Sequence, residues 1–248
     1  MERSWYAFYD EGVRRNIDYP RMPMKSYFSK WVAKNPDKPY LIWGDKQLTY
    51  KEANSVACKL ASSIISLGYV KGDRIALMST NLPEYIICLQ ACWKLGAAIV
   101  PTNPMYTVPE LTHQFGDSGA KIVFSEAQFA NKVVELIKNG KTSVEKLVVI
   151  QTANKVEFEP TDYLLDYNDL VAKGEDKEPD IDVKAEDLSM LQYTGGTTGL
   201  SKGCLLSNAN LEAMAFQDIE WFKPPFNDPE TIIAMAAMPL YHIYGFNT

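Results

Sequence analysis

The sequence predicts an α/β fold in which mostly parallel sheets are covered by flanking helices, built from successive βαβ units. Over residues 74–150, short apolar runs of strand length alternate with amphipathic segments of helix length. The composition, 46% hydrophobic and 23% charged over 248 residues, is that of a globular chain that can bury a sizeable core. Right-handed crossovers in such units place helices against the faces of the sheet.

Each element has its own signal in the sequence. Residues 1–23 are aromatic and irregular, which predicts a segment lying against a preformed surface. Apolar spacing predicts a helix over 24–34, a turn signal predicts a hairpin over 40–49, and a capping box of Thr49 and Glu52 predicts a helix reaching Leu67. The elements expected next are strand 74–78, helix 82–94 begun at Asn81, strand 97–100, helix 108–117, strand 121–125, helix 129–139 and strand 146–150.

A change in composition divides the chain. Residues 172–187 are highly charged and poor in apolar side chains, which predicts a solvated connector. We therefore expect a lead-in and first βα subdomain over 1–171, the connector over 172–187, and the start of a second subdomain over 188–248.

Charge and hydropathy exclude several classes of protein. A net charge of −6 argues against broad nucleic-acid binding, although it allows a locally positive pocket. The longest apolar run, 232–238, is too short to span a bilayer, and the first residues lack the apolar region of a signal peptide. The four cysteines form no C-x-x-C pair, so we expect structural thiols and a cytoplasmic setting.

The most informative stretch is 193–203, Tyr-Thr-Gly-Gly-Thr-Thr-Gly-Leu-Ser-Lys-Gly. Glycines allow positive φ and close backbone approach, while hydroxyl groups and Lys202 add donors and a positive charge. The spacing matches neither a Walker A motif nor G-x-G-x-x-G. Apolar residues on both sides predict two strands joined by a loop that binds the phosphates of a nucleotide, with a plain flexible turn as the alternative.

Two further segments follow the loop. A helix is expected over 210–221, with Ser207 or Asn208 as its N-cap and Glu212 in its first turn. A strand is expected over 231–235. Earlier in the chain, His113 has no neighbour placed to bind a metal or activate a nucleophile, so a partly buried or surface histidine is expected there.

The 193–203 segment resembles the phosphate-binding signature of the adenylate-forming enzymes, which include acyl-CoA synthetases, luciferases and peptide-synthetase adenylation domains. The family usually has proline before the lysine, whereas this chain has Ser201, which leaves φ less restricted. Residues 71–84 and 94–104 are similar to the family's G-D-R-V…N-x-x-E and K-x-G-A-x-x-V-P-x-N-P segments, and we interpret both as scaffold. Residues 239–245, Pro-Leu-Tyr-His-Ile-Tyr-Gly, resemble its P-x-x-H-x-x-G motif, which lines the acyl-substrate pocket.

The resemblance implies the N-terminal part of the large domain of an adenylate-forming enzyme, and a reaction in two steps. A carboxylate attacks the α-phosphorus of ATP, and the thiol of CoA then displaces AMP from the acyl-adenylate. Binding of ATP is assigned to Thr194, Gly195, Gly196, Thr197, Thr198, Gly199 and Lys202, and contact with Mg²⁺ to Thr194. The acid is assigned to Tyr241, His242, Tyr244, Gly245 and Phe246, with His242 also the catalytic candidate. A buried core histidine is the alternative for His242.

The resemblance covers the whole chain but only the front portion of a full family member, so we expect a fragment that does not turn over ATP alone. The family's Y-G-x-T-E segment, ribose-binding aspartate and C-terminal adenylation lysine do not occur, and most of the CoA site would lie outside. The Phe-Tyr-Asp-Glu-Gly sequence at 8–12 favours a medium- or long-chain fatty acid. The alternatives are a non-catalytic nucleotide-binding or interaction module, and an adenylation domain for amino or aryl acids.

Overall fold

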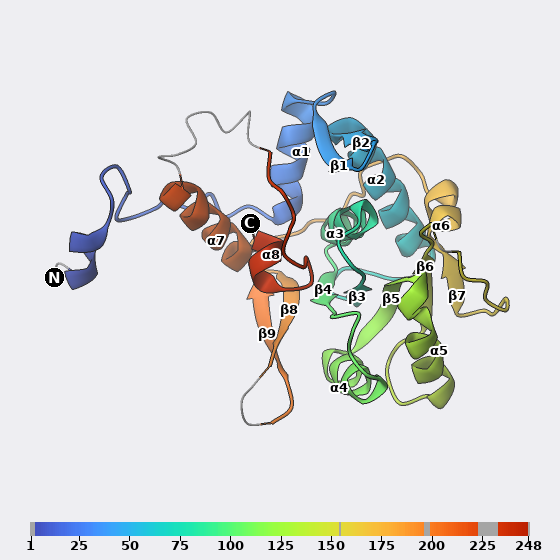
Figure 1. Cartoon of the computed structure of the whole chain (residues 1–248). Coiled ribbons are helices and arrows are strands. Elements are labelled where there is room, and N and C mark those ends of the chain that lie inside the picture. Colours follow the sequence, from blue (N-terminus) through green and yellow to red (C-terminus); the bar gives the residue numbers. More distant parts are fainter. Residues whose placement is uncertain (1–2, 154, 196–198, 223–232, 248) are drawn as a thin grey trace.

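A seven-stranded sheet with helices on both faces forms the centre of the computed structural model, which describes residues 3–153, 155–195, 199–222 and 233–247 (Figure 1). The strand order is β7-β6-β5-β3-β4-β8-β9, and every neighbouring pair is parallel except β8 and β9. The strands are β3 Arg74–Met78, β4 Ala98–Pro101, β5 Ala120–Glu126, β6 Lys146–Ile150, β7 Leu164–Asp166, β8 Leu188–Thr194 and β9 Lys202–Ser207. The predicted fold class is therefore confirmed.

Helices cover the sheet in two sets. The α-helices are α1 Met24–Lys34, α2 Tyr50–Ser66, α3 Pro83–Leu95, α4 Val108–Ser118, α5 Ala130–Asn139, α6 Tyr167–Lys173, α7 Asn208–Phe222 and α8 Ile243–Asn247. Two short 3₁₀ turns are η1 Ser4–Phe8 and η2 Ala127–Phe129. No helix within the described residues is both long and apolar enough to cross a membrane.

The core has two halves, one on each face of the sheet. Ile75 and Leu77 belong to the half packed under α2 and α3, whereas Ala76 and Met78 belong to the half under α4 and α5. Because successive strand residues point to opposite faces, a strand covered on both sides must be apolar throughout. This explains the continuous apolar runs in the sequence.

A separate hairpin lies beside α2. Strands β1 Pro39–Trp43 and β2 Lys46–Thr49 pair antiparallel, as predicted. The capping box at the start of α2 is also confirmed, since the Glu52 N–H donates to Thr49 Oγ1 at 3.2 Å and the Thr49 N–H donates to Glu52 Oε2 at 2.8 Å.

Several sequence predictions were wrong in detail. Helix α3 begins at Pro83 with Leu82 as its N-cap, because the Asn81 side chain is bonded elsewhere. Residues 233–235 form no strand, and the first two residues of that predicted strand, 231 and 232, lie outside the described residues. The short elements β7 and α6 were not predicted from the sequence.

Helix α7 differs from its predicted pattern. Ser207 precedes the helix and exchanges hydrogen bonds with Asn210, so the predicted cap is confirmed. However, Glu212 lies beyond the first turn, which holds no acidic residue. Glu212 and Glu220 are buried because the segment before α1 lies along this helix: the Arg14 N–H donates to Glu220 and the Arg21 N–H to Glu212, both at 3.1 Å.

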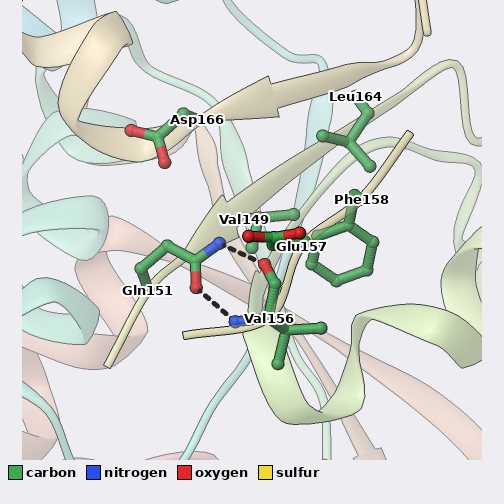
Figure 2. A pocket seen from close by; sticks show the side chains of 7 residues that line it. All are labelled: Val149, Gln151, Val156, Glu157, Phe158, Leu164 and Asp166. Carbon is green, nitrogen blue, oxygen red and sulfur yellow. Dashed lines mark hydrogen bonds between the residues drawn. The ribbon is translucent and has the colours of Figure 1, made fainter. Parts of the chain in front are cut away.

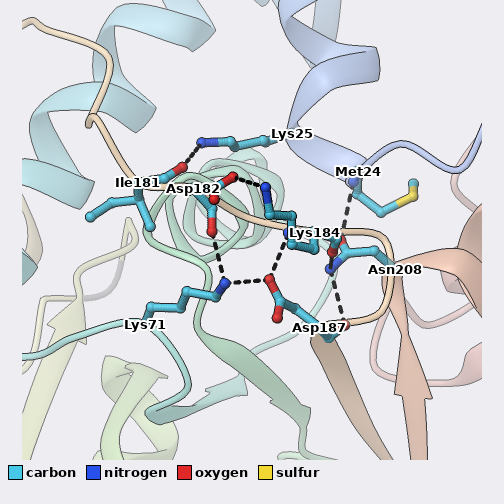
Figure 3. Close-up of polar contacts among 8 residues, drawn as sticks. All are labelled: Met24, Lys25, Lys71, Ile181, Asp182, Lys184, Asp187 and Asn208. Carbon is cyan, nitrogen blue, oxygen red and sulfur yellow. Dashed lines mark hydrogen bonds and ion pairs between the residues drawn. The ribbon is translucent and has the colours of Figure 1, made fainter.

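Most residues of the connector are exposed, as its composition predicts, but it is held to the rest of the chain at several points. Figure 3 shows two lysines holding it: Lys25 on α1 donates to the Ile181 carbonyl at 2.5 Å, and Lys71 in the loop before β3 donates to the Asp182 carbonyl at 2.7 Å. Lys71 also pairs with Asp187 at 2.5 Å. Although burial raises the pKa of Asp187, the pair with Lys71 and the Lys184 N–H outweigh it, so that its pKa lies below the ordinary value. The charged side chains therefore form specific contacts, while the division into subdomains stays a prediction.

Candidate functional site

Three neighbouring strands, β3, β4 and β8, run parallel and end at one edge of the sheet. The residues that follow them are polar: Ser79 to Asn81 after β3, Thr102 and Asn103 after β4, and Thr194 at the end of β8. In open α/β sheets, ligands bind beyond the carboxyl ends of the strands. The predicted phosphate loop therefore lies at the edge where such a site is expected.

The β8–β9 hairpin carries this loop. Its register places Thr194 opposite Lys202 and Tyr193 opposite Gly203. A cavity of about 520 Å³ opens at the loop end of the hairpin, and residues of the hairpin and of α4 line it: His113, Asp117, Thr194, Gly199, Leu200, Ser201, Lys202 and Gly203. Thr194 and Lys202 are exposed, and the Lys202 ammonium group makes no hydrogen bond or ion pair within the described part of the chain.

The structure thus brings together three of the predicted phosphate ligands, Thr194, Gly199 and Lys202, around one cavity. Gly195 directly follows Thr194 and is exposed. Three others, Gly196, Thr197 and Thr198, lie outside the described residues. The role assigned to each of them stays a prediction.

The described glycines of the loop serve different purposes. Gly199 has φ +148°, a backbone conformation that side chains disfavour. A Cβ atom at Gly203 would lie 3.0 Å from Cζ of Tyr193, so this glycine allows the two strands to approach across the tyrosine ring. Gly195 has open space where a Cβ atom would be.

Helix α4 contacts the hairpin next to its loop through two side chains. His113 Nε2 lies 2.7 Å from the carbonyl oxygen of Ser201, and the Tyr193 hydroxyl donates to Asp117 Oδ2 at 2.5 Å. Burial and the neighbouring Asp117 raise the pKa of Tyr193, so it stays a neutral donor. The predicted half-buried histidine is confirmed. Its place beside the loop was missed, although the i,i+4 spacing of His113 and Asp117 puts both on one helix face.

The predicted acid-binding residues form a second group, at the turn into α8. Tyr241 is half-buried, while His242 and Tyr244 are exposed, which excludes the alternative of a buried core histidine. The Tyr244 N–H donates to Nδ1 of His242 at 3.2 Å, so the other ring nitrogen carries the proton in the neutral imidazole. None of these residues lines the 520 Å³ cavity.

Packing explains the glycine and the phenylalanine of this group. A Cβ atom at Gly245 would lie 2.4 Å from the Pro239 carbonyl oxygen, so only glycine lets α8 pack against the preceding turn. Phe246 meets Trp93 edge-on, with ring centroids 5.9 Å apart. Phe246 is therefore half-buried against α3.

Gln192 on β8 connects the two groups. Its Nε2 donates to the Tyr241 carbonyl at 3.5 Å, and Thr194 follows two residues later on the same strand. The side chain is 6% exposed, and its Oε1 has no hydrogen-bond partner within the described residues. Strand β8 therefore forms one side of the phosphate hairpin and also contacts the turn into α8.

Two other cavities lie away from these groups. One of about 350 Å³ borders β6 and β7, where the Gln151 side-chain amide bonds both the N–H and the carbonyl of Val156, at 3.1 and 2.9 Å (Figure 2). Another of about 1070 Å³ lies between the β1–β2 hairpin and the start of α3. Neither is lined by a predicted site residue.

The chain is thus an α/β protein whose sheet carries a glycine- and threonine-rich hairpin at the edge where ligands bind in open α/β sheets. Residues 28–248 match the family described as AMP-binding enzyme, and the chain belongs to this family. The resemblance found in the sequence is thereby confirmed.

Relatives within the family activate several kinds of acid, according to their names. The long-chain-fatty-acid–CoA ligase of Haemophilus influenzae is 30% identical, over 99% of this chain and 47% of that protein. The 4-coumarate–CoA ligase 3 of Arabidopsis thaliana is 30% identical, over 94% of this chain and 40% of that protein. A solved long-chain-fatty-acid-CoA ligase from Archaeoglobus fulgidus superimposes with a TM-score of 0.78 at 25% identity, over 96% of this chain and 46% of that one. The chain spans about half the length of these relatives.

Proposed function

We propose that this chain supplies the nucleotide-phosphate and carboxylic-acid sites of an AMP-forming acid–CoA ligase. One observation carries the proposal: the exposed Lys202 ammonium group and Thr194 hydroxyl stand opposite each other across the hairpin, at the cavity beside α4. An ammonium group with no partner among the described residues, beside glycine-rich backbone, suits the polyanionic tail of ATP. Membership of the AMP-binding family supports the same assignment.

The proposed reaction has two steps. A carboxylate oxygen bonds to the α-phosphorus of ATP as the bond from that phosphorus to pyrophosphate breaks. The sulfur of CoA then bonds to the acyl carbon, AMP leaves, and the thiol proton is released. Both partners of the first step are anionic, so neutralisation of phosphate charge and alignment of the attack supply the catalysis. Lys202 neutralises charge on the β- and γ-phosphates, while Tyr241 and His242 border the acid.

The residues present suit Mg²⁺ bound together with ATP. Mg²⁺ takes oxygen ligands and keeps several waters and phosphate oxygens, so it needs few protein groups. The Thr194 hydroxyl and the Asp117 carboxylate line one cavity, while no cluster of three or more His, Cys, Asp or Glu side chains occurs in the part of the chain that the structure describes. Thr194 would hold the ion, which would screen phosphate charge during the attack.

The proposed acid is a medium- or long-chain fatty acid. The long-chain-fatty-acid–CoA ligase alignment covers 99% of the chain, and the fatty-acid relatives recur among the structural neighbours. An aryl acid is the second candidate, favoured by the 30% identity to a 4-coumarate–CoA ligase. Titration of octanoate and of 4-coumarate into the chain with Mg–ATP separates the two. We also propose a cytoplasmic setting, supported by three buried free thiols at Cys58, Cys88 and Cys92.

Calorimetric titration with Mg–ATP tests the phosphate site. Lys202→Ala is expected to weaken binding by about tenfold or more, the usual effect of losing a charged hydrogen-bond donor. Lys138→Ala removes another exposed lysine, on α5, and is expected to bind as the unaltered chain does. Equal weakening in both variants, or no weakening with Lys202→Ala, would contradict the site. Absence of any binding to the unaltered chain would contradict the proposal for this chain, including the alternative of a non-catalytic nucleotide-binding module.

A further inference from the structure

The loop between β3 and α3 holds residues 236–240, which lead into residues 239–245, the segment predicted to bind the acid and called here the acid motif. Asn81 Nδ2 donates to the carbonyl oxygens of Ala236 at 2.7 Å and Met238 at 2.8 Å, and the Leu240 N–H donates to Asn81 Oδ1 at 2.9 Å. These partners lie 155 to 159 residues away along the chain. One side chain thus fixes three alternate residues of the later segment.

The chemistry of these contacts requires an amide. The carboxamide of Asn presents two N–H donors and one carbonyl acceptor on a short stem, which matches two carbonyls and one N–H on one side of an extended backbone. Aspartate would keep the acceptor but face the two carbonyls with a carboxylate oxygen. Asn81 does not cap α3, so these contacts are its only described role.

The loop that carries Asn81 is itself fixed. Both the N–H and the hydroxyl of Thr80 donate to Glu126 Oε2 on β5, at 3.2 and 2.8 Å. Glu126 is 4% exposed, and Gln128 donates to its other oxygen at 2.5 Å. Asn81 therefore projects from a rigid edge of the sheet.

The last of these contacts, at Leu240, lies inside the acid motif. Leu240 is 8% exposed, and its carbonyl accepts from the Tyr85 hydroxyl at 3.3 Å. The turn follows directly: the His242 N–H donates to the Pro239 carbonyl at 3.0 Å, and the Tyr241 carbonyl lies against Gln192. We propose that Asn81 is a positioning residue of the acid site, which sets where Tyr241 and His242 stand relative to β8. The identity of the ligand rests on the proposed function, whereas the positioning contact does not.

Amide hydrogen exchange of the unaltered chain and its variants tests the contact itself. In the unaltered chain, the Leu240 N–H and the side-chain N–H groups of Asn81 are expected to be protected. Asn81→Ala removes all three hydrogen bonds and is expected to speed exchange at Leu240 and His242 by about tenfold or more. Asn81→Asp keeps an acceptor for the Leu240 N–H but turns a carboxylate oxygen toward the two carbonyls, and this repulsion is expected to speed exchange less than Asn81→Ala does. Asn103→Ala is the matched control, since Asn103 is also half-buried in a loop after a sheet strand, and among the described residues its side chain bonds only the Met105 N–H.

The core amides of Ile75 and Val123 report whether each variant is folded. If a variant does not fold, protection of the Asn81 side-chain N–H groups in the unaltered chain decides the matter alone. Free exchange of those groups, or unchanged exchange at Leu240 in a folded Asn81→Ala variant, would overturn the inference. Equal acceleration in Asn103→Ala would overturn it as well.

A ligand titration separates positioning from general stability. The His242 ring is followed by NMR while octanoate or Mg–ATP is added. Asn81→Asp is expected to weaken octanoate binding by about tenfold while leaving Mg–ATP binding unchanged, because it shifts the acid motif and not the hairpin. If Asn81→Asp weakened the binding of both ligands equally, Asn81 would only stabilise the fold, and the proposed positioning role would be wrong. If the unaltered chain binds neither ligand, the proposed function fails, and the exchange measurement still judges the contact.

Discussion

A buried lysine whose partner is half-exposed gives a sharp test of how the connector is held. Lys94 lies in the last turn of α3 with its side chain 1% exposed, and it pairs with Glu178, whose side chain is 43% exposed. The Lys94 ammonium group also lies 5.7 Å from the centroid of the Phe28 ring, and the Cys58 thiol donates to the same carboxylate. The two members of the pair therefore differ in their access to water.

That difference predicts an asymmetry between the two deletions. Glu178→Gln leaves an ammonium group buried without a carboxylate, and we expect the free energy of unfolding to fall by about 2–3 kcal/mol, discounted from the usual cost because one partner is half-exposed. Lys94→Met removes the buried charge and keeps a similar volume, while Glu178 turns toward water. We expect a change of about 0–1 kcal/mol for that variant.

Urea unfolding followed by circular dichroism measures both effects, with an unchanged slope showing that only stability has altered. In thermal unfolding, each kcal/mol corresponds to about 2–4 °C in a chain of this size. The control is Asp182→Asn, which breaks a pair with Lys184 whose side chains are 76% and 60% exposed, and it is expected to have no measurable effect. The reasoning fails if Glu178→Gln behaves like this control, or if Lys94→Met is the more destabilising of the two.

Two further predictions concern helix packing and capping. Gly245→Ala would place a Cβ atom 2.4 Å from the Pro239 carbonyl oxygen, so we expect a loss of about 1–3 kcal/mol in urea unfolding; Gly116→Ala, on α4 with open space around it, should not destabilise, and equal effects of the two would contradict the packing argument. Hydrogen bonds from the Thr107 hydroxyl and N–H lower the pKa of Glu110 below its ordinary value of 4.5. The ionised Glu110 therefore stabilises α4 fully above pH 4.5, and this stabilisation is lost as the pH falls through the lowered pKa. Thr107→Val should raise the pKa of Glu110 in a carboxyl NMR titration, and an unchanged pKa would refute this account.

Much of the fold follows from local signals in the sequence. Helix 24–34 and strands 74–78 and 146–150 match the structure residue for residue, since apolar spacing and flanking turn residues define them. The predicted helix start at Asn81 was wrong because its side chain bonds a residue 155 positions away and does not cap α3. A single sequence carries no signal for such long-range contacts, because pattern reasoning sees only neighbours along the chain.

Prediction of the candidate site divides in the same way. The loop from Thr194 to Lys202 stood out because its glycines, hydroxyls and lysine are adjacent in sequence. His113 and Asp117 did not, because they reach the hairpin only when α4 packs beside β9. The relation between the phosphate loop and the acid motif also depends on Gln192, which sequence spacing did not single out.

The position of Lys202 in a strand, and not in the loop, has a physical consequence for the site. Directly opposite residues of an antiparallel pair project to the same face, so the register fixes the Lys202 ammonium and the Thr194 hydroxyl on one side of the hairpin. Tyr193, opposite Gly203, projects to the other side and is buried against α4. A slip of one residue would turn Lys202 toward the tyrosine ring and bury its charge. The Tyr193–Gly203 contact, which leaves no room for a Cβ atom, therefore holds the register that keeps the lysine at the surface for an anionic ligand.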